Sequence, residues 1–319
     1  MGIGRECGRV DKTKYGAIMS ALPAEKETSI NLVYYHKDLI VKAPRYVANM
    51  PNDEYQSHKA SVSNSQLKLI ARSPAHFKYP PERAETRNKV LGSALHMACL
   101  EPDLFYKTYV LLRNAKDRTT SEYKEAKKEH GEEFVLTSSE CARVEGIMNS
   151  LYKNPAIRSL LELPGYNELS GFSTDPVTGV VCRHRFDKLT HCGIAVDLKT
   201  TVDARPDAFS RSILTYGYNI QDAFYSDQYN WITGEFLQDF VFIAIESESP
   251  FAPKLYRLDE DSILIGRDAY RKALDSYAYC LEMDEWPAYE DQEIEEIGIP
   301  QWAIKKHENE LIESFQFTE

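Results

Sequence analysis

Residues 180–200 read VVCRHRFDKLTHCGIAVDLKT, and the fold is organised around them. Two strand-like runs flank a short turn at residues 190–193, so the stretch predicts a β-hairpin. The second strand carries Asp197 and Lys199, and residues two apart share one face of a strand. The first strand carries Asp187, which hairpin pairing would bring close to Asp197. Two carboxylates beside a lysine are suited to binding a divalent cation and holding a phosphodiester against it.

The composition is that of a folded protein with a substantial core. Hydrophobic residues make up 43% of the 319 residues, and no run approaches the roughly 18 apolar residues of a membrane span. The N-terminal sequence MGIGRECGRVDKTKYG lacks the apolar segment of a signal peptide, so we expect a cytoplasmic location. The cysteines form no CxxC pair, which argues against a structural zinc site.

The net charge of −11 argues against a general affinity for nucleic acid, but the charges are unevenly distributed. Residues 68–89 are rich in Lys and Arg, whereas the chain after residue 282 is strongly acidic. We therefore expect a local basic groove, in which Arg87 and Lys89 are candidate DNA contacts. The acidic tail would lie away from the phosphates or cover a partner surface.

The order of the predicted elements indicates an α/β fold with a mixed sheet. Helices are predicted at residues 63–72, 88–100, 138–163 with an interruption at Pro155, 207–216, 220–236 and 259–281. Strands are predicted at residues 30–35, 39–41, 168–174, in the hairpin, at 239–246 and at 254–258. We divide the chain into an N-terminal arm or extra layer (1–60), a main domain (61–287) and an acidic C-terminal tail (288–319).

An isolated Asp-x-Lys is weak evidence, because ion pairs on exposed strands are common. The order Asp187, nine residues, then Asp197-Leu198-Lys199 on one hairpin is more specific, and it resembles the PD-(D/E)xK nuclease motif. Residues 92–96 (GSALH), followed by 100–102 (LEP), resemble the histidine-bearing helix of RecB-like nucleases. Residues 217–225 (GYNIQDAFY) are similar to their Gln-xxx-Tyr helix. Residues 63–65 and 73–77 resemble the start of the nuclease domain of RecE, exodeoxyribonuclease VIII.

The resemblance implies a PD-(D/E)xK core, with a mixed central sheet flanked by helices and with helical N-terminal additions. It also implies roles for individual residues. The implied metal ligands are His96, Asp187, Asp197 and the Leu198 carbonyl, with Glu168 as either a further ligand or a solvated acid. Lys199 becomes the catalytic lysine. Gln221 and Tyr225 share a helix face and would support the site, contact DNA or simply pack. Arg183 and Arg185 would bind phosphates or balance the carboxylates. One departure is Phe186, which replaces the proline of the motif.

The activity implied by the resemblance is a Mg²⁺-dependent 5′→3′ exonuclease acting on double-stranded DNA ends, with Mn²⁺ as a substitute metal. Its product would carry a 3′ single-stranded tail for a RecT-like annealing protein. Members of that family form a toroidal homotetramer, and enclosure of the duplex would explain processive digestion. The protein would act in the bacterial cytoplasm, or as a phage protein in the host cytoplasm.

Three alternatives remain to be weighed. A nuclease with an iron–sulfur cluster needs a cysteine group near the C-terminus, but only Cys280 lies beyond residue 192, so we expect no cluster. A PD-(D/E)xK endonuclease would share the metal site and add a base-reading element. A non-catalytic DNA-binding or assembly protein would have a decayed site, and the intact His96, Asp187, Asp197 and Lys199 argue against decay.

Overall fold

The computed structural model describes residues 30–81, 86–289 and 294–316. Its contacts divide the chain into two compact units, Met1–Trp286 and Pro287–Glu319, and each is described by itself. The described part of the smaller unit contains the helix α13 (Gln301–Gln316). The described part of the expected N-terminal arm, residues 30–60, contributes strands to the sheet of the larger unit, and residues 1–29 lie outside the described residues.

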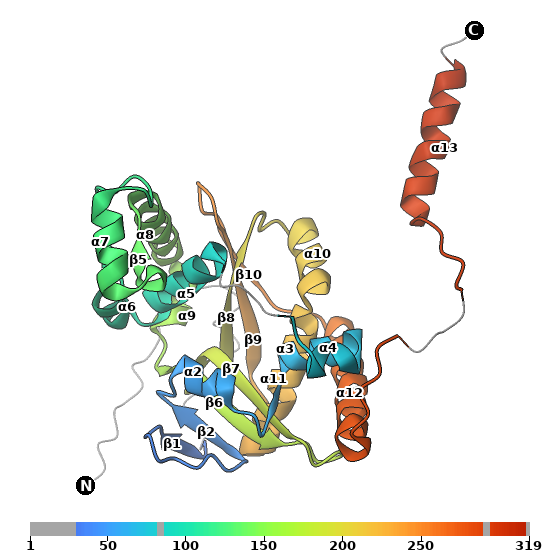
Figure 1. The fold of residues 1–319 in the computed structure, drawn as a ribbon, viewed down its shortest axis with the longest axis horizontal. Coiled ribbons are helices and arrows are strands. Elements are labelled where there is room, and N and C mark those ends of the chain that lie inside the picture. The colour runs from blue at the N-terminus through green and yellow to red at the C-terminus, as the bar shows by residue number, and fades with distance from the viewer. Residues whose placement is uncertain (1–29, 82–85, 290–293, 317–319) are drawn as a thin grey trace. The chain divides into compact units, whose positions relative to one another are not determined.

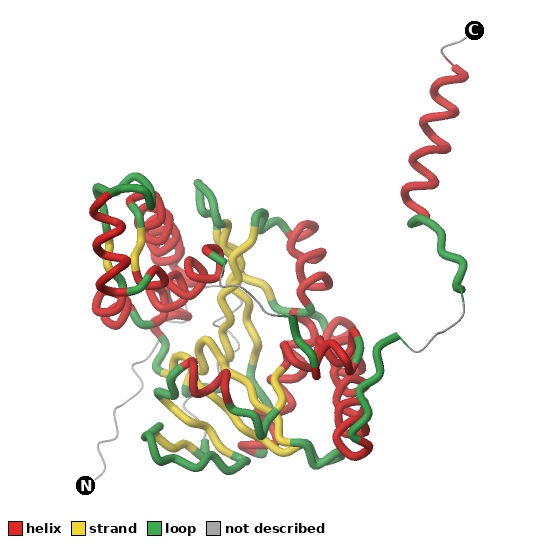
Figure 2. The backbone as a smooth tube through the Cα atoms, in the orientation of Figure 1, coloured by secondary structure: helices red, strands yellow, loops and turns green. Residues whose placement is uncertain are grey.

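The larger unit is built on a central mixed sheet, drawn as yellow strands in Figure 2. The strands follow the spatial order β1-β2-β6-β7-β8-β9-β10, and β3 pairs with β7. β6, β7 and β8 form an antiparallel meander, whereas β8 and β9 run parallel. The strands are β1 (Leu32–Tyr34), β2 (Arg45–Ala48), β3 (Val62–Ser63), β6 (Gly165–Thr174), β7 (Val181–Thr190), β8 (Ile194–Thr201), β9 (Asp239–Glu246) and β10 (Pro253–Tyr256). A separate pair joins β4 (Val110–Leu111) and β5 (Val135–Leu136).

Helices flank the sheet in two groups (Figure 1). The first group contains α5 (Arg87–Leu100), α6 (Pro102–Thr108), α7 (Ser121–His130), α8 (Ser138–Lys153) and α9 (Pro155–Glu162), with a 3₁₀ turn at Glu132–Phe134. The second contains α3 (Asn64–Arg72), α4 (Pro74–Lys78), α10 (Pro206–Tyr216), α11 (Tyr218–Thr233) and α12 (Glu260–Met283). A short helix, α2 (Asn52–Ser57), lies between β2 and β3 in the chain. Among the described helices, none combines the length and the apolar character needed to cross a bilayer.

Two cores cover opposite faces of β8 and β9, because successive side chains of a strand point to opposite faces. One core joins Ile194, Val196 and Leu198 to α5, α8 and α9. The other joins Ala195 and its β9 neighbours to α10 and α11. Asp197 and Lys199 have the parity of Ala195, so their side chains face α10 and α11. The strand parity therefore decides which helices can contact Asp197 and Lys199.

The mixed α/β fold expected from the sequence is confirmed, including a hairpin next to the strand at residues 239–246. Pro155 does restart the helix, since α8 ends at Lys153 and α9 begins at the proline. The strand expected at residues 39–41 is wrong: these residues form no strand, and β2 lies at Arg45–Ala48 instead. Tyr46 and Val47 are both fully buried, so β2 lacks the alternation of apolar and polar residues that marks a half-exposed strand.

Candidate metal centre

Three carboxylates lie side by side across the strands of the meander. The pairs Asn167↔Lys188 and Leu169↔Phe186 flank the position where Glu168 on β6 faces Asp187 on β7. The β7–β8 ladder pairs Lys188 with Val196, so Asp187 comes next to Asp197 on β8. The charges of Asp187 and Asp197 both act on Glu168, and the charge of Asp187 acts on Asp197. The register thus brings the three carboxylates near one another.

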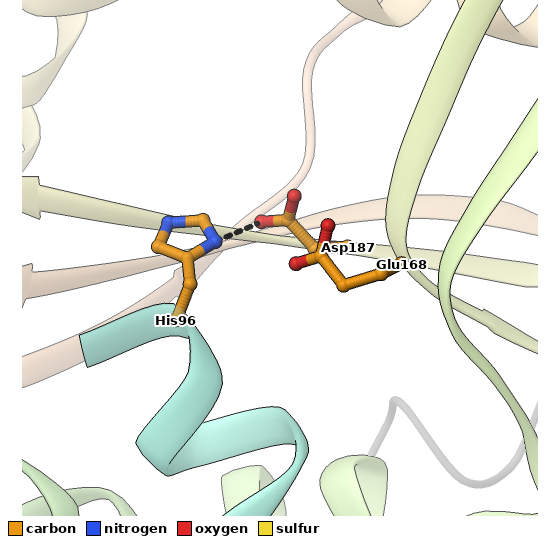
Figure 3. Close-up of side chains that lie close together, drawn as sticks. All are labelled: His96, Glu168 and Asp187. Carbon is orange, nitrogen blue, oxygen red and sulfur yellow. Dashed lines mark ion pairs between the residues drawn. The ribbon is translucent and has the colours of Figure 1, made fainter. Parts of the chain in front are cut away.

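Helix α5 brings His96 to this row (Figure 3). Nδ1 of His96 lies 3.4 Å from Oδ2 of Asp187. One ligand atom from each of His96, Glu168 and Asp187 can be chosen so that all lie within 4.8 Å of one another. Carboxylate oxygens and an imidazole nitrogen are donors that suit a hard or borderline divalent cation. The donor set therefore fits the divalent metal that the sequence predicts, and it includes Glu168.

The backbone at Glu168 has φ +47°, a left-handed conformation that is uncommon for a residue with a side chain. The neighbouring residues Asn167 and Leu169 keep their pairing with β7, so the distortion is confined to one position. Local backbone strain of this kind persists where the surrounding structure holds it, and it is concentrated at functional sites. At Glu168 it coincides with the candidate metal ligands.

Asp197 is 2% exposed and has its two carboxylate oxygens engaged by different side chains. Oδ1 accepts a hydrogen bond from Nε2 of Gln221 on α11. Oδ2 lies 2.5 Å from Nζ of Lys199, whose ammonium also lies 4.9 Å from the centre of the Tyr218 ring. A carboxylate oxygen has more than one lone pair, so these contacts leave Asp197 able to bind a metal as well. The structure brings Gln221, Asp197 and Lys199 together, as expected.

Burial and mutual repulsion perturb these acids. Burial, reinforced by the charge of Asp187, raises the pKa of Glu168 to about 8, and Arg185 partly opposes the shift. Burial also raises the pKa of Asp197 to about 6, against the favourable charge of Lys199. For Lys199 burial disfavours the ammonium, but Asp197 and Asp187 outweigh it and raise the pKa above its usual value. Such a cluster of perturbed pKa values is typical of catalytic and metal-binding sites.

Glu101 is an acid near the site that the sequence analysis assigned no role. It follows the last residue of α5, and its charge contributes to the raised pKa of Glu168. Burial raises the pKa of Glu101 itself, and Arg185 opposes this. The signal in the sequence was its position, five residues after His96 at the end of the same helix.

Two of the arginines predicted to contact DNA bind other parts of the protein instead. Arg183 is 2% exposed, and its guanidinium donates to the carbonyls of His58 and Ser61. Arg87 forms an ion pair with Glu140 and donates to the backbone carbonyls of Glu132 and Val135. Both guanidiniums therefore hold the fold together.

Arg185 and Lys89 lie in more open surroundings. Arg185 is half-buried, donates to Met50 O at 2.8 Å and lies 4.4 Å from the Tyr55 ring. Its charge acts on Glu168, so it balances the carboxylates. Lys89 is exposed in the first turn of α5, and its contact with DNA stays a prediction.

The remaining candidates are Tyr225 and the Leu198 carbonyl. Tyr225 packs against the rings of His184 and Phe186, at 5.1 and 5.6 Å between ring centres. Burial, with smaller effects from charges that include those of Asp197 and Asp187, raises the pKa of Tyr225, and its role in the site stays a prediction. The N–H of Leu198 donates to Oδ2 of Asp187 at 2.8 Å, and the role of its carbonyl stays a prediction.

Comparisons with known proteins agree with this geometry. The solved structure of a protein from Eubacterium rectale, described as a "putative exonuclease", matches with a TM-score of 0.54 and 14% identity, over 80% of this chain and 98% of that one. At this identity the match shows the fold. A second structure, SSO0001, matches with a TM-score of 0.30 and 14% identity, over 70% of this chain and 82% of that one, and supports no argument. No curated protein matches the chain significantly. The family model described as "PDDEXK-like domain of unknown function" matches residues 63–296, most of the chain, and therefore the protein belongs to this family.

Proposed function

We propose that the protein is a Mg²⁺-dependent 5′→3′ exonuclease that digests double-stranded DNA from its ends. The observation that carries the proposal is the cluster of His96, Glu168 and Asp187, close to the ion pair of Asp197 and Lys199. The PDDEXK-like family supports nuclease activity, and the name of the Eubacterium rectale protein supports the choice of an exonuclease.

The metal would be held by His96, Glu168 and Asp187, with Asp197 beside them. Bound there, a divalent cation would supply an activated water and would neutralise charge at the phosphate. The chain's own contribution centres on Lys199. Because Asp197 and Asp187 raise its pKa, Lys199 is an ammonium at neutral pH. Its role is therefore to donate hydrogen bonds to the phosphate and stabilise the charge that develops there, and it is a poor general base.

Gln221 acts through Asp197. Its Nε2 donates to Oδ1 and leaves Oδ2 to Lys199, which fixes the rotation of the carboxylate. Supporting hydrogen bonds of this kind orient metal-site carboxylates. Gln221 is thus a positioning residue of the proposed site.

The proposal extends to partners. A 5′→3′ exonuclease leaves a 3′ single-stranded tail, the substrate of a RecT-like single-strand annealing protein in recombination. A homotetrameric ring would enclose the duplex and prevent its escape between cuts. Light scattering coupled to size exclusion measures the subunit number. A monomer that is nevertheless processive would contradict the ring.

The activity is tested with a linear duplex labelled at one 5′ end and a closed circular duplex, both with Mg²⁺. We expect release of the 5′ label and an intact circle. Lys199→Met should reduce the rate at least about 100-fold, because preorganised charge at the reaction centre is worth that much or more. Lys254→Met on β10, where the side chain is exposed, is the matched control and should retain full activity.

Each other outcome points to a different function. Cutting of the circle would favour the PD-(D/E)xK endonuclease. Release of the 3′ label first would reverse the proposed polarity. An absence of cleavage with Mg²⁺ and Mn²⁺, together with an absence of Mn²⁺ binding, would identify a non-catalytic DNA-binding or assembly protein.

A further inference from the structure

Lys68 on α3 reaches the site from outside the motif residues. Its ammonium donates a hydrogen bond to the carbonyl of Tyr216, the last residue of α10. A Cβ at the next residue, Gly217, would lie 3.0 Å from Cε and 3.3 Å from Nζ of Lys68. Gly217 has φ +63°, so a glycine both permits the turn and leaves room for the lysine.

Lys68 and Lys199 lie on either side of the corner between α10 and α11. Lys68 contacts Tyr216 and Gly217, while Lys199 lies over the Tyr218 ring. The rings of Tyr216 and Tyr218 stack with 5.7 Å between their centres. Burial, together with the charge of Lys199, lowers the pKa of Lys68 to about 8, and the charge of Asp197 opposes this shift.

A structural role for Lys68 explains only part of this arrangement. Lysines commonly satisfy the last carbonyls of a helix, where the helix dipole also favours a cation. Any neutral donor could make the same bond to Tyr216, however. Among the described residues, no carboxylate lies within 4.0 Å of the Lys68 ammonium. A partly buried cation beside a second cation favours the binding of an anion, and the charge of Asp197 offsets the repulsion only in part.

A cleft begins at this corner. It has a volume of about 770 Å³, and its lining near the corner includes Thr200 and Thr201, which follow Lys199 directly, together with Tyr216 and Tyr218. Its two lining acids, Asp203 and Glu248, are paired with Arg205 and Arg143. Tyr216 is 59% exposed, so its ring is accessible from the cleft. An aromatic surface next to cations is the combination that binds single-stranded nucleic acid, through base stacking and phosphate contacts.

We propose that Lys68 binds a backbone phosphate of the strand being cut, next to the phosphate held at Lys199, so that the strand passes the Tyr216–Tyr218 corner into the cleft. The proposal rests on the proposed nuclease function and adds a residue that positions the substrate. The hydrogen bond to Tyr216 uses one of the three N–H groups of the ammonium, which leaves two for the phosphate.

The test separates the charge of Lys68 from its hydrogen bond. Lys68→Gln keeps a donor for the Tyr216 carbonyl and removes the charge, whereas Lys68→Met removes both. Binding of a short fluorescent single-stranded oligonucleotide is measured by anisotropy over a range of salt, with Ca²⁺ replacing Mg²⁺ to prevent cleavage. We expect both variants to bind about tenfold more weakly at low salt. The slope of log Kd against log salt should fall by about 0.7, the loss of one single-strand phosphate contact.

Two controls make the result specific. Lys78→Met removes a lysine whose ammonium already pairs with Asp284 and lies over Trp286, and it should leave the slope unchanged. A series of oligonucleotides, each with one uncharged methylphosphonate, should reveal one position that weakens wild-type binding but not binding by Lys68→Gln. Thermal melting checks that each variant is folded.

If Lys68→Gln shows the wild-type slope of log Kd against log salt, the proposal is wrong. If only Lys68→Met binds the oligonucleotide more weakly, Lys68 does no more than cap α10. Equal sensitivity of wild type and Lys68→Gln at every methylphosphonate position would also overturn it. If one methylphosphonate position weakens binding by the wild type but not by Lys68→Gln, and the wild type cleaves no DNA, the proposed nuclease function is wrong while the phosphate contact of Lys68 is supported.

Discussion

Oδ2 of Asp187 accepts a hydrogen bond of 2.8 Å from the backbone N–H of Leu198, and the same oxygen lies 3.4 Å from Nδ1 of His96. The β7–β8 ladder ends just before this point, at the pair Lys188↔Val196. A side chain therefore takes over the role of a backbone acceptor where the two strands begin to separate. The bond ties a candidate metal ligand to the strand that carries Asp197 and Lys199.

The dual role of Asp187 predicts different effects of two substitutions. Asp187→Asn keeps an oxygen for the Leu198 N–H, so we expect an unchanged melting temperature. Mn²⁺ affinity, measured by calorimetry, should fall at least about 100-fold, because the loss of a supporting partner alone costs about 10–100-fold. Asp187→Ala should lose about 1 kcal/mol of stability in addition. Tight Mn²⁺ binding by Asp187→Asn would contradict the metal centre.

Gln221 and Gln228 allow a matched comparison within α11, since both are buried glutamines with a side-chain partner. Gln221→Leu frees Asp197 to rotate, so the cleavage rate should fall about 10–100-fold. Gln228 instead accepts a hydrogen bond from Ser173 at 2.9 Å. Gln228→Leu should lower stability by about 1–3 kcal/mol and leave the rate of the folded protein unchanged. Single-turnover kinetics measures the cleavage rate of each variant, and urea unfolding measures its stability. If Gln221→Leu and Gln228→Leu cleave at equal rates, Gln221 does not position Asp197 for catalysis.

The pH dependence of stability depends partly on His184. Burial lowers the pKa of His184 to about 3, whereas a histidine in the unfolded chain has a pKa of about 6.5. Below pH 6.5 the unfolded chain takes up a proton that the folded protein does not. The contribution of His184 is therefore complete above pH 6.5, and about 1.4 kcal/mol is lost per pH unit as the pH falls from there towards 3.

The measurement is urea unfolding at pH 7, 6 and 5 for wild type and His184→Phe, which keeps an aromatic ring against Tyr46 and Phe186. Other groups titrate in both proteins, so the difference between them isolates His184. We expect the wild type to lose stability relative to the variant as the pH falls. The exposed His130 on α7 provides a control, and His130→Phe should follow the wild-type curve.

A substitution of Arg183 tests whether this side chain stabilises the fold or binds DNA. Its guanidinium donates to the carbonyls of His58 and Ser61, which Arg183→Met would leave unsatisfied. We expect unfolding free energy to fall by about 1–3 kcal/mol. Folded Arg183→Met should keep the wild-type salt slope of DNA binding, in contrast to Lys68→Gln. If Arg183→Met instead lowers the salt slope of DNA binding and leaves the unfolding free energy unchanged, Arg183 contacts DNA.

Local patterns in the sequence were sufficient for much of the fold. The hairpin, the apolar strand at residues 239–246 and the helix after Asp259 have clear periodicity or turn residues, and each lies where it was predicted. The short β2 strand was missed because four mostly buried residues carry no period. The spacing of Asp187, Asp197 and Lys199 on two paired strands also placed these three side chains correctly, since pairing register follows from a short turn.

The sequence by itself determined the hairpin and the spacing of Asp187, Asp197 and Lys199, because these depend on residues close together in the chain, and the order of its elements indicated the mixed sheet. Only the tertiary structure decided which distant residues complete the site. Glu168 joins through the β6–β7 register, and Lys68 arrives on α3, 131 positions before Lys199 in the chain. The same packing decided that Arg183 binds backbone carbonyls. Burial and proximity across separate elements set these roles, and no local pattern of residues encodes them.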